Sequence, residues 1–536
     1  MKIPARHLKH QRTLLTKRWL LEYTGKRTLL PDTGFKLTCP GTASSIPSGL
    51  VVGLYCDVGD VRGDKMKLTA SGQKYDDLVK GKLKHQLKLA LPPPKLGQVR
   101  TFYGLDETFN AVAVAGLGTD CVGYDPTEEM DEQKEVIRMA AGAGSKALQE
   151  LSMQRIYVDS FGHSESAAEG ACMGVWLYQQ NKTEKDQRMM PKIELFDCGD
   201  WIGWQIGQQK ANAQNLARQL METPANLLTP SAFALSVVEV LTKSGVDVEV
   251  RCKNWAKLRQ FNAFLAVSSG SGQPPVFLEV LYEGCEPDVS PIVLVGKGIT
   301  FDAGGLCLKS CNAMRHTRGD MAGAAAVVAA VRAIAALQIP INVRGLIPLC
   351  ENMPGACAFK PGDIIKSYNG KTILVQDTSY EGRLILADAL SYSVTYSPKF
   401  IVDVGTLTTD LMDVMGSSAA AVFTNSDQLY DLMRIASIHT GDRVWRLPLW
   451  EYYEKGVTDI SKSDVLNVGT TREGSACKAA AFLRQFVPQA CDWIHVDTYG
   501  ITRTSGKTYT YLRRGMSGRP TRTLIEFLSQ LACRSS

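Results

Sequence analysis

Short apolar runs alternate with stretches of helical spacing over residues 45–197. Strand-like runs lie at 48–56, 109–117 and 155–159, and the apolar residues of 128–151 recur at helical spacing. An alternation of strands and helices is typical of a sheet that is covered by helices. We therefore expect an N-terminal α/β domain over residues 45–197.

A single long helix is expected after this domain. The apolar residues of 204–223 recur at helical spacing, and the pattern ends before Pro224, which cannot continue a helix. One side of this helix carries Ile206, Ala213, Leu216 and Leu220. We interpret residues 198–223 as a linker helix between two domains, because a chain of 536 residues exceeds the usual size of one domain.

Beyond residue 224 the apolar runs become nearly continuous. Helical spacing returns between them at 320–337 and 382–395. The strand-like runs are residues 246–251, 276–281, 292–301, 341–349, 372–376 and 400–407. Strands that are apolar on both faces are typical of a parallel sheet covered by helices on both sides. We therefore expect a larger C-terminal domain over residues 224–533.

The expected fold class is α/β, with two domains that each contain a mixed or mostly parallel sheet covered by helices. In a parallel sheet, binding sites form beyond the carboxyl ends of the strands. Three such ends carry polar residues, at 297–305, 377–383 and 406–410. The C-terminal domain is therefore where we expect the chemistry.

Positive charge is concentrated at the N-terminus. The whole chain has a formal net charge of +6, but residues 1–30 alone contain eight Lys or Arg residues and one acidic residue, Glu22. The remainder is close to neutral, which argues against a nucleic-acid-binding surface. A basic, acid-poor N-terminus is typical of a mitochondrial transit peptide. We expect residues 1–40 to be such a peptide with a linker, and the protein to lie in the mitochondrial matrix; a basic tail on a cytoplasmic protein is the alternative.

Cysteine usage favours a reducing compartment. The 14 cysteines are scattered, and Cys307 and Cys311 have no His or second Cys pair at zinc-finger spacing. Free thiols are expected for this pattern. No apolar run approaches the roughly 20 residues that span a bilayer, so no membrane span is expected.

Three acidic residues lie at predicted strand or helix ends of the C-terminal domain, namely Asp302, Asp320 and Glu381. Carboxylates that are brought together repel one another unless a cation lies between them, and hard divalent ions prefer oxygen ligands. The pattern therefore indicates a site for Mn²⁺, Mg²⁺ or Zn²⁺. Lys297 would join it as a neutral amine, because metal ligands must be deprotonated. Each signal also has an ordinary explanation, since an acid at a helix start is frequently a cap.

Three motifs around these residues carry a family resemblance. They read Val-Gly-Lys-Gly-Ile-Thr-Phe-Asp at 295–302, Arg-Gly-Asp-Met-Ala-Gly-Ala at 318–324, and Glu-Gly-Arg-Leu-Ile-Leu-Ala-Asp-Ala-Leu at 381–390. In order and spacing they resemble the leucyl aminopeptidase (cytosol aminopeptidase) family. The likeness covers roughly residues 205–530, whereas the N-terminal domain matches only in pattern.

The resemblance implies a two-metal exopeptidase that releases N-terminal residues from peptides and is commonly a homohexamer. By this analogy the tighter metal, Mn²⁺ or Zn²⁺, is bound by Lys297, Asp302, Asp320 and Glu381. Asp302 and Glu381 would bridge to a second, more exchangeable metal. Two further residues would be catalytic: Lys309 would stabilise the tetrahedral intermediate, and Arg383 would hold a bicarbonate that acts as general base.

The chain departs from the family pattern beside the metals. The family reads Asn-Thr-Asp-Ala-Glu-Gly-Arg where this chain has Asp-Thr-Ser-Tyr-Glu-Gly-Arg at 377–383. Ser379 therefore replaces the aspartate that would bind the second metal, and a neutral hydroxyl is a poor ligand. Asp377 is a candidate substitute, although it lies roughly 6–7 Å away along an extended chain. Further departures are Tyr380, Thr409 and Tyr499.

These departures resemble those of the insect sperm leucyl aminopeptidases, which are associated with mitochondria and with the paracrystalline material of sperm tails. On this basis we expect a weakly active or inactive homologue, a pseudoenzyme that binds one metal ion per subunit and has a structural role as a homo-oligomer. The alternative is an active metal-dependent aminopeptidase that acts on peptides.

Overall fold

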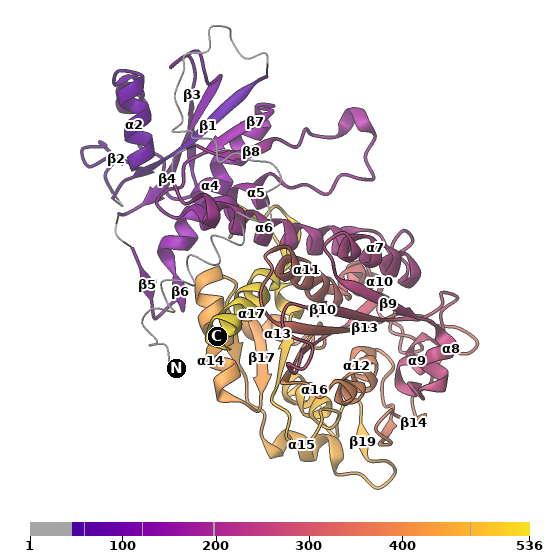
Figure 1. The fold of residues 1–536 in the computed structure, drawn as a ribbon. Helices are drawn as coiled ribbons and strands as arrows, with labels where there is room; N and C mark the ends of the chain where they lie inside the picture. The colour runs from indigo at the N-terminus through magenta and orange to yellow at the C-terminus, as the bar shows by residue number, and fades with distance from the viewer. Residues whose placement is uncertain (1–45, 58, 121, 197–198, 472, 536) are drawn as a thin grey trace.

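The computed structural model describes residues 46–535 except 58, 121, 197–198 and 472, so the expected transit peptide lies outside the described residues. The chain forms a smaller N-terminal and a larger C-terminal α/β part, with the helix α6 (Trp201–Glu222) between them (Figure 1). The expected fold class, α/β with two helix-covered sheets, is confirmed.

The N-terminal sheet has six strands in the order β3-β4-β1-β7-β8, with β2 beside β1. Four neighbouring strands, β4, β1, β7 and β8, run parallel, while β2 and β3 pair antiparallel to their neighbours. The strands are β1 (Ser48–Tyr55), β2 (Lys67–Leu68), β3 (Val99–Phe102), β4 (Ala111–Gly118), β7 (Arg155–Val158) and β8 (Lys192–Leu195). A two-stranded hairpin, β5 (Tyr124–Asp125) and β6 (Met130–Asp131), extends from this sheet.

Helices cover both faces of the N-terminal sheet. They are α2 (Ala70–Leu78), α3 (Lys82–Leu89), α4 (Glu132–Glu150) and α5 (Ser164–Val175), with a 3₁₀ turn η1 (Glu184–Asp186). Successive residues of a strand point to opposite faces. Accordingly Val51 packs with α4 and α5, whereas Leu50 and Val52 pack with α2 and α3.

The C-terminal sheet has nine strands in the order β18-β17-β20-β16-β11-β13-β10-β9, with β12 beside β13. They are β9 (Asp247–Arg251), β10 (Val276–Glu283), β11 (Ile292–Gly296), β12 (Gly298–Asp302), β13 (Asn342–Asn352), β16 (Phe400–Gly405), β17 (Ala420–Thr424), β18 (Val444–Arg446) and β20 (Trp493–Asp497). Smaller sheets contain β14 (Ile364–Lys366), β15 (Thr372–Leu374) and β19 (Val465–Leu466), and β21 (Arg503–Thr504) with β22 (Gly515–Met516).

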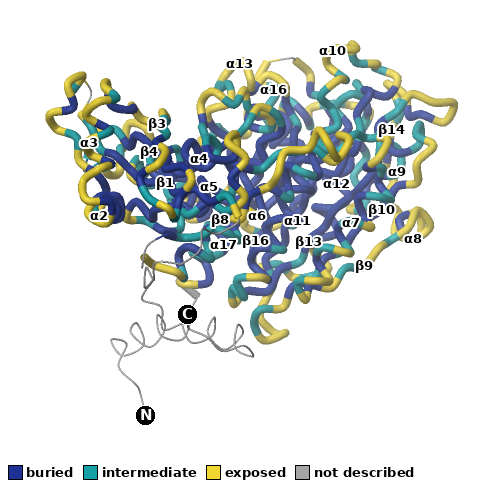
Figure 2. Tube along the Cα trace, turned by 90° about the horizontal axis from the view of Figure 1, so that it is seen from above, coloured by how far each residue is buried: buried dark blue, intermediate teal, exposed yellow. Residues whose placement is uncertain are grey.

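The helices of this part divide between the two faces of the sheet. They are α7 (Pro230–Thr242), α8 (Lys253–Leu258), α9 (Asn262–Ser268), α10 (Cys311–Met314), α11 (Ala322–Ala336), α12 (Glu381–Tyr392), α13 (Leu411–Met415), α14 (Asp427–Thr440), α15 (Glu451–Thr458), α16 (Ser475–Arg484) and α17 (Thr521–Ser535), with the 3₁₀ turns η2 (Thr317–Gly319), η3 (Ser393–Tyr396) and η4 (Tyr499–Ile501). In β11, Ile292 and Leu294 pack with α11 and α17, whereas Val293 and Val295 pack with α9 and α12. The central strands β13 and β16 and the helix α11 are therefore mostly buried, whereas the edge strand β9 is largely exposed (Figure 2).

The structure differs in detail from the predicted elements. The run at 292–301 is two strands, because Lys297 donates its backbone N–H to Val404 and the chain then leaves β16 to pair only with β13. The sheet is mixed, since β10 pairs antiparallel with β9 and β13, and β17 with β20. An apolar run specifies a buried strand without specifying its direction.

A buried ion network joins the two parts of the chain. Arg522 of α17 lies 2.9 Å from Glu169 of α5 and 3.2 Å from Asp442, and Arg138 of α4 lies 2.5 Å from the same Glu169. Burial would raise the pKa of Glu169, but Arg138, Arg522 and Lys210 bring it down to about 2. The network therefore remains charged at neutral pH.

A second ion pair at this junction is expected to make the stability of the protein depend on pH. Glu526 of α17 lies 2.6 Å from Lys210 of α6. Burial would raise the pKa of Glu526, but Lys210 lowers it from 4.5 to about 2. Because the folded pKa is the lower one, the pair stabilises the protein above the ordinary pKa, and this contribution is lost as the pH falls toward 2.

We therefore expect Glu526→Gln to lower the free energy of unfolding by roughly 2–3 kcal/mol at about pH 7 and by progressively less below about pH 4. Urea unfolding across this pH range measures the difference. Glu451→Gln is the control, because the Glu451–Lys455 pair is 75% and 69% exposed and should contribute little at any pH. A difference between wild type and Glu526→Gln that does not change with pH would contradict the assignment.

Membrane insertion was not expected. Among the described residues, no helix combines the length and the apolar character needed to cross a bilayer.

Candidate metal centre

Three acidic side chains meet at one edge of the C-terminal sheet. Asp302 is the last residue of β12, Asp320 follows the 3₁₀ turn η2, and Glu381 is the first residue of α12. One carboxylate oxygen of each lies within 4.8 Å of the other two. Asp302 and Glu381 are buried, and Asp320 keeps 11% of its side chain exposed.

The Lys297 side chain lies among these carboxylates. Its Nζ is 2.7 Å from Asp320 Oδ2 and 2.9 Å from Glu381 Oε1, and it donates to the backbone oxygen of Thr406 at 2.7 Å. Burial alone would lower the pKa of Lys297, but the charges of Asp320, Glu381 and Asp302 raise it above its ordinary value. The amine is therefore an ammonium here, and it can become a metal ligand only if a metal displaces its proton.

Glycines allow the deep side of this centre to close. A Cβ atom on Gly382 would lie 2.5 Å from Lys297 Cε, and one on Gly323 would overlap the backbone oxygen of Val404. Helix α11 can therefore approach β16 only because Gly323 lacks a side chain, and Gly382 of α12 leaves the space that the Lys297 side chain occupies.

Sequence reasoning missed the residues that orient the carboxylates. Buried Asn352, at the end of β13, donates from Nδ2 to Asp302 Oδ1 at 2.9 Å. Thr406, just after β16, donates from Oγ1 to Asp320 Oδ1 at 2.5 Å. Both residues lie at strand ends, which is the signal that could have identified them.

The two predicted catalytic residues differ in their contacts with the carboxylates. Lys309 pairs with Asp302 Oδ2, and although burial lowers its pKa, the charges of Glu381, Asp302 and Asp320 raise it above the ordinary value. Arg383 is buried in the first turn of α12, where it donates from Nη1 to the backbone oxygen of Asn467 at 2.6 Å.

One edge of the Arg383 guanidinium is buried without a hydrogen-bond partner in the described part of the chain. Its Nε and Nη2 make no hydrogen bond with the described residues. Burial lowers the pKa of the guanidinium to about 10. The ring of Tyr380 covers one face of the guanidinium, with its centroid 4.7 Å from Cζ. Nε and Nη2 form a planar fork that suits an oxyanion, so the stacked Tyr380 narrows the approach without occupying the fork.

Ser379 and Asp377 are hydrogen-bonded to each other within one turn. Asp377 Oδ1 accepts hydrogen bonds from the Ser379 backbone N–H at 2.8 Å and from Ser379 Oγ at 2.7 Å. The segment is a turn and not the extended chain that was assumed for Asp377. In this arrangement the Asp377 carboxylate is turned to Ser379 and is not part of the three-carboxylate group.

The other departures from the family pattern are at least partly exposed. Tyr499 is half-buried, and its pKa is raised by burial and by the nearby charge of Asp320. Thr409 is exposed and donates to its neighbour Asp410 at 3.2 Å. Tyr380, Tyr499 and Ser379 are all partly accessible, in contrast to buried Glu381 and Lys297.

The donor set fits a divalent cation. Three carboxylates within 4.8 Å offer the oxygen ligands that hard cations prefer, and a buried ammonium already supplies positive charge at the same place. A bound cation would be a Lewis acid next to the Lys309 ammonium and the fork of Arg383. This arrangement suits hydrolysis at a carbonyl.

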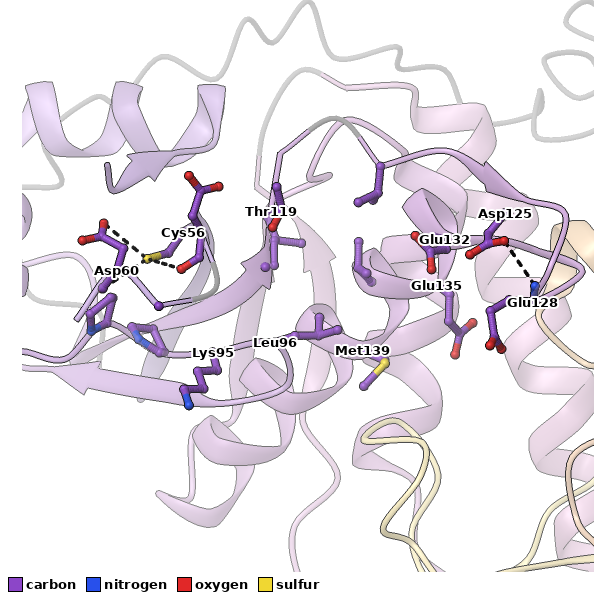
Figure 3. Close-up of a pocket in the computed structure, with 18 of the residues that line it drawn as sticks. Cys56, Asp60, Lys95, Leu96, Thr119, Asp125, Glu128, Glu132, Glu135 and Met139 are labelled. Atoms are coloured by element: carbon purple, nitrogen blue, oxygen red, sulfur yellow. Dashed lines mark hydrogen bonds between the residues drawn. The ribbon is translucent and has the colours of Figure 1, made fainter. Parts of the chain in front are cut away.

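A cavity of about 720 Å³ lies elsewhere, in the N-terminal part. Figure 3 shows it between Cys56 and Asp60 on one side and Glu132 and Glu135 of α4 on the other. None of the three clustered carboxylates lines it, so it is separate from the candidate centre.

Two models of one protein family match the two parts of the chain. The model of the cytosol aminopeptidase family, catalytic domain, matches residues 215–525, and that of the N-terminal domain of the same family matches residues 51–185. The likeness therefore extends beyond the C-terminal region, to which the sequence motifs had limited it.

Individual relatives are similar over nearly the whole chain. The cytosol aminopeptidase of Sus scrofa is 47% identical over 91% of this chain and 93% of its own length, and that of Homo sapiens is 46% identical over 91% and 93%. Among solved structures, the bottromycin maturation enzyme BotP in complex with Mn has a TM-score of 0.76 at 28% identity, covering 91% of this chain and 100% of that one.

Proposed function

Because the chain belongs to the cytosol aminopeptidase family, we propose that it binds one divalent cation tightly and a second one weakly, and that its aminopeptidase turnover is low. The observation that supports this proposal is the difference between the ligands available for the two cations. Asp302, Asp320 and Glu381 converge within 4.8 Å, whereas Ser379 offers only a hydroxyl that donates to Asp377.

The tight site would be formed by the three carboxylates and Lys297. Mn²⁺ or Zn²⁺ fits this set, and the similarity to the BotP complex with Mn supports the choice of Mn²⁺ for a first test. The metal would polarise a peptide carbonyl and lower the pKa of a bound water. Lys309 would neutralise the developing oxyanion, and Arg383 would hold a small anion on its fork.

A fully active aminopeptidase is the second candidate. It is favoured by Asp377, whose carboxylate keeps a negative charge in the same turn, 2.7 Å from Ser379 Oγ. If this carboxylate rotated toward the centre, it would restore the missing ligand charge. In both proposals the substrate is a peptide with a free N-terminal amine.

Location and assembly are further parts of the proposal. The basic, acid-poor residues 1–30 support import into the mitochondrial matrix, with the cytoplasm as the alternative. The resemblance to the sperm leucyl aminopeptidases supports a structural role as a homohexamer. Light scattering of the purified chain tests the assembly, and a monomer would contradict it.

Metal titration tests the proposed centre. We expect calorimetric titration with Mn²⁺ to show one tight site per chain, and a leucyl chromogenic substrate to be hydrolysed slowly. Asp320→Asn should weaken the tight site by at least about 10–100-fold, because it removes a ligand charge. Glu239→Gln, on the exposed face of α7, is the control. Two tight sites with rapid turnover would favour the fully active enzyme, and no binding would contradict both candidates.

A further inference from the structure

The turn that presents Asp320 is tied to the helix between the two domains. We propose that Glu222, the last residue of α6, is a positioning residue that holds Asp320 in its metal-binding orientation through Arg318. This inference rests on the proposed metal centre and extends it to the domain junction.

The first contact is an ion pair. Arg318 lies within the 3₁₀ turn η2, two residues before Asp320, and its Nη2 donates to Glu222 Oε2 at 2.8 Å. The side chains are 30% and 14% exposed, so the pair is partly shielded from water. A 3₁₀ turn of three residues has few hydrogen bonds of its own, and its orientation therefore depends on such outside contacts.

The second contact connects Glu222 to the C-terminal segment. Glu222 Oε1 accepts a hydrogen bond from the backbone N–H of Met516 at 2.6 Å. The side chain of Met516 in turn lies against the η2 turn, because a Cβ atom on Gly319 would be 2.8 Å from Met516 Cε. Glu222 thus supports the turn twice, directly through Arg318 and indirectly through Met516.

Asp320 has little other restraint on this side. Its carboxylate contacts Thr406 Oγ1 through Oδ1 and the Lys297 ammonium through Oδ2. Both partners lie on the sheet side of the residue, where Thr406 Oγ1 also reaches the Asp320 backbone oxygen at 3.3 Å, whereas the turn is held from the α6 side through the Arg318 side chain. If Glu222 no longer anchored the turn, Asp320 could shift relative to Asp302 and Glu381 without breaking the sheet.

Metal affinity is the direct measurement. We expect Glu222→Gln and Arg318→Met to weaken Mn²⁺ binding to the full chain by about 10–100-fold in calorimetric titration, because outer residues that orient a ligand have effects of this size. Arg318→Lys keeps the charge and should restore affinity to within a few-fold of the wild type. A pair with only a structural role would lower thermal stability without changing the dissociation constant.

Glu129→Gln is the matched control. Glu129 pairs with Arg434 at 2.7 Å with 26% and 33% exposure, far from the centre in sequence, and this variant should bind Mn²⁺ like the wild type. Unchanged affinity in Glu222→Gln and Arg318→Met would overturn the proposal.

Hydrogen exchange of the metal-free protein supplies a second readout. We expect Glu222→Gln to speed amide exchange within residues 315–321, and Glu129→Gln to leave it unchanged. Equal exchange rates in the wild type and Glu222→Gln would overturn the positioning role even if no metal bound. Absence of Mn²⁺ binding by the wild type, together with faster exchange in Glu222→Gln, would instead contradict the proposed metal centre and leave the anchoring of the turn supported.

Discussion

Replacing Ser379 by Asp together with Asp377 by Asn is expected to raise the aminopeptidase turnover of this chain by about 100-fold or more, because it supplies the missing ligand of the second metal. The double replacement matters, since Asp377 Oδ1 lies 2.7 Å from Ser379 Oγ. Ser379→Asp alone would place two carboxylates side by side, and one of them would then be protonated or displaced. We therefore expect the single variant to gain much less than the double variant.

Metal stoichiometry and kcat/KM, measured on the same preparations, test this expectation. The double variant should bind two Mn²⁺ ions per chain, against one tight ion in the wild type. Asp377→Asn alone serves as the control, because it leaves the second site without a carboxylate and should not increase turnover. If the double variant binds a second ion but remains inactive, the stacked Tyr380 is the next residue to replace, by Ala. If the wild type is already as active as the double variant, Ser379 does not limit catalysis.

Arg522→Met is expected to destabilise the protein by up to about 3–5 kcal/mol, because buried Glu169 and Asp442 would each keep only one arginine partner, Arg138 and Arg519. The guanidinium lies 2.9 Å from Glu169 and 3.2 Å from Asp442 and donates from Nε to Gln214 at 2.6 Å. Arg522 is fully buried, so water cannot replace these contacts. Urea unfolding, followed by tryptophan fluorescence, measures the loss.

A double replacement distinguishes the loss of the ion pair from the loss of side-chain packing. Arg522→Met with Glu169→Gln should be less destabilising than the sum of the two single changes, since removing both charges leaves fewer unpaired. Arg446→Met is the surface control, because its partner Asp427 is 87% exposed and the pair should contribute less than about 1 kcal/mol. Equal losses for Arg522→Met and Arg446→Met would contradict a structural role of the buried network.

The fold could be predicted from the sequence where the pattern of apolar residues specifies a strand or a helix. Residues 400–407 were expected as a buried strand, and β16 lies at Phe400–Gly405 with helices on both faces. Strand direction was not readable, because β10 is mostly buried like the parallel strands β11 and β16 and yet pairs antiparallel with β13. The ion network was also out of reach, since Glu169 and Arg522 are 353 positions apart. Such pairing depends on how the domains dock and leaves no local pattern.

Some residues of the candidate centre could be predicted from the sequence, and others could not. Asp302, Asp320 and Glu381 could be identified because all three acids lie at predicted strand or helix ends within the motifs that carry the family resemblance, and the structure brings them together. Their assignment as metal ligands stays a prediction. Asn352 and Thr406 were missed as orienting residues because a single amide or hydroxyl at a strand end is common. Glu222 could not be identified from the sequence, because a glutamate at the end of a helix is common and only the structure shows its contact with Arg318 of the η2 turn.

The glycines at 323 and 382 also bear on how this sequence can diverge. The Val404 backbone leaves no room for a side chain at Gly323, and the Lys297 side chain fills the space at Gly382, whereas Ser379, Tyr380, Tyr499 and Thr409 are partly or fully exposed. These four departures from the family pattern therefore lie at accessible positions. Mutational drift there can remove a reaction without unfolding the chain. A descendant could therefore lose its chemistry and still persist as a building block.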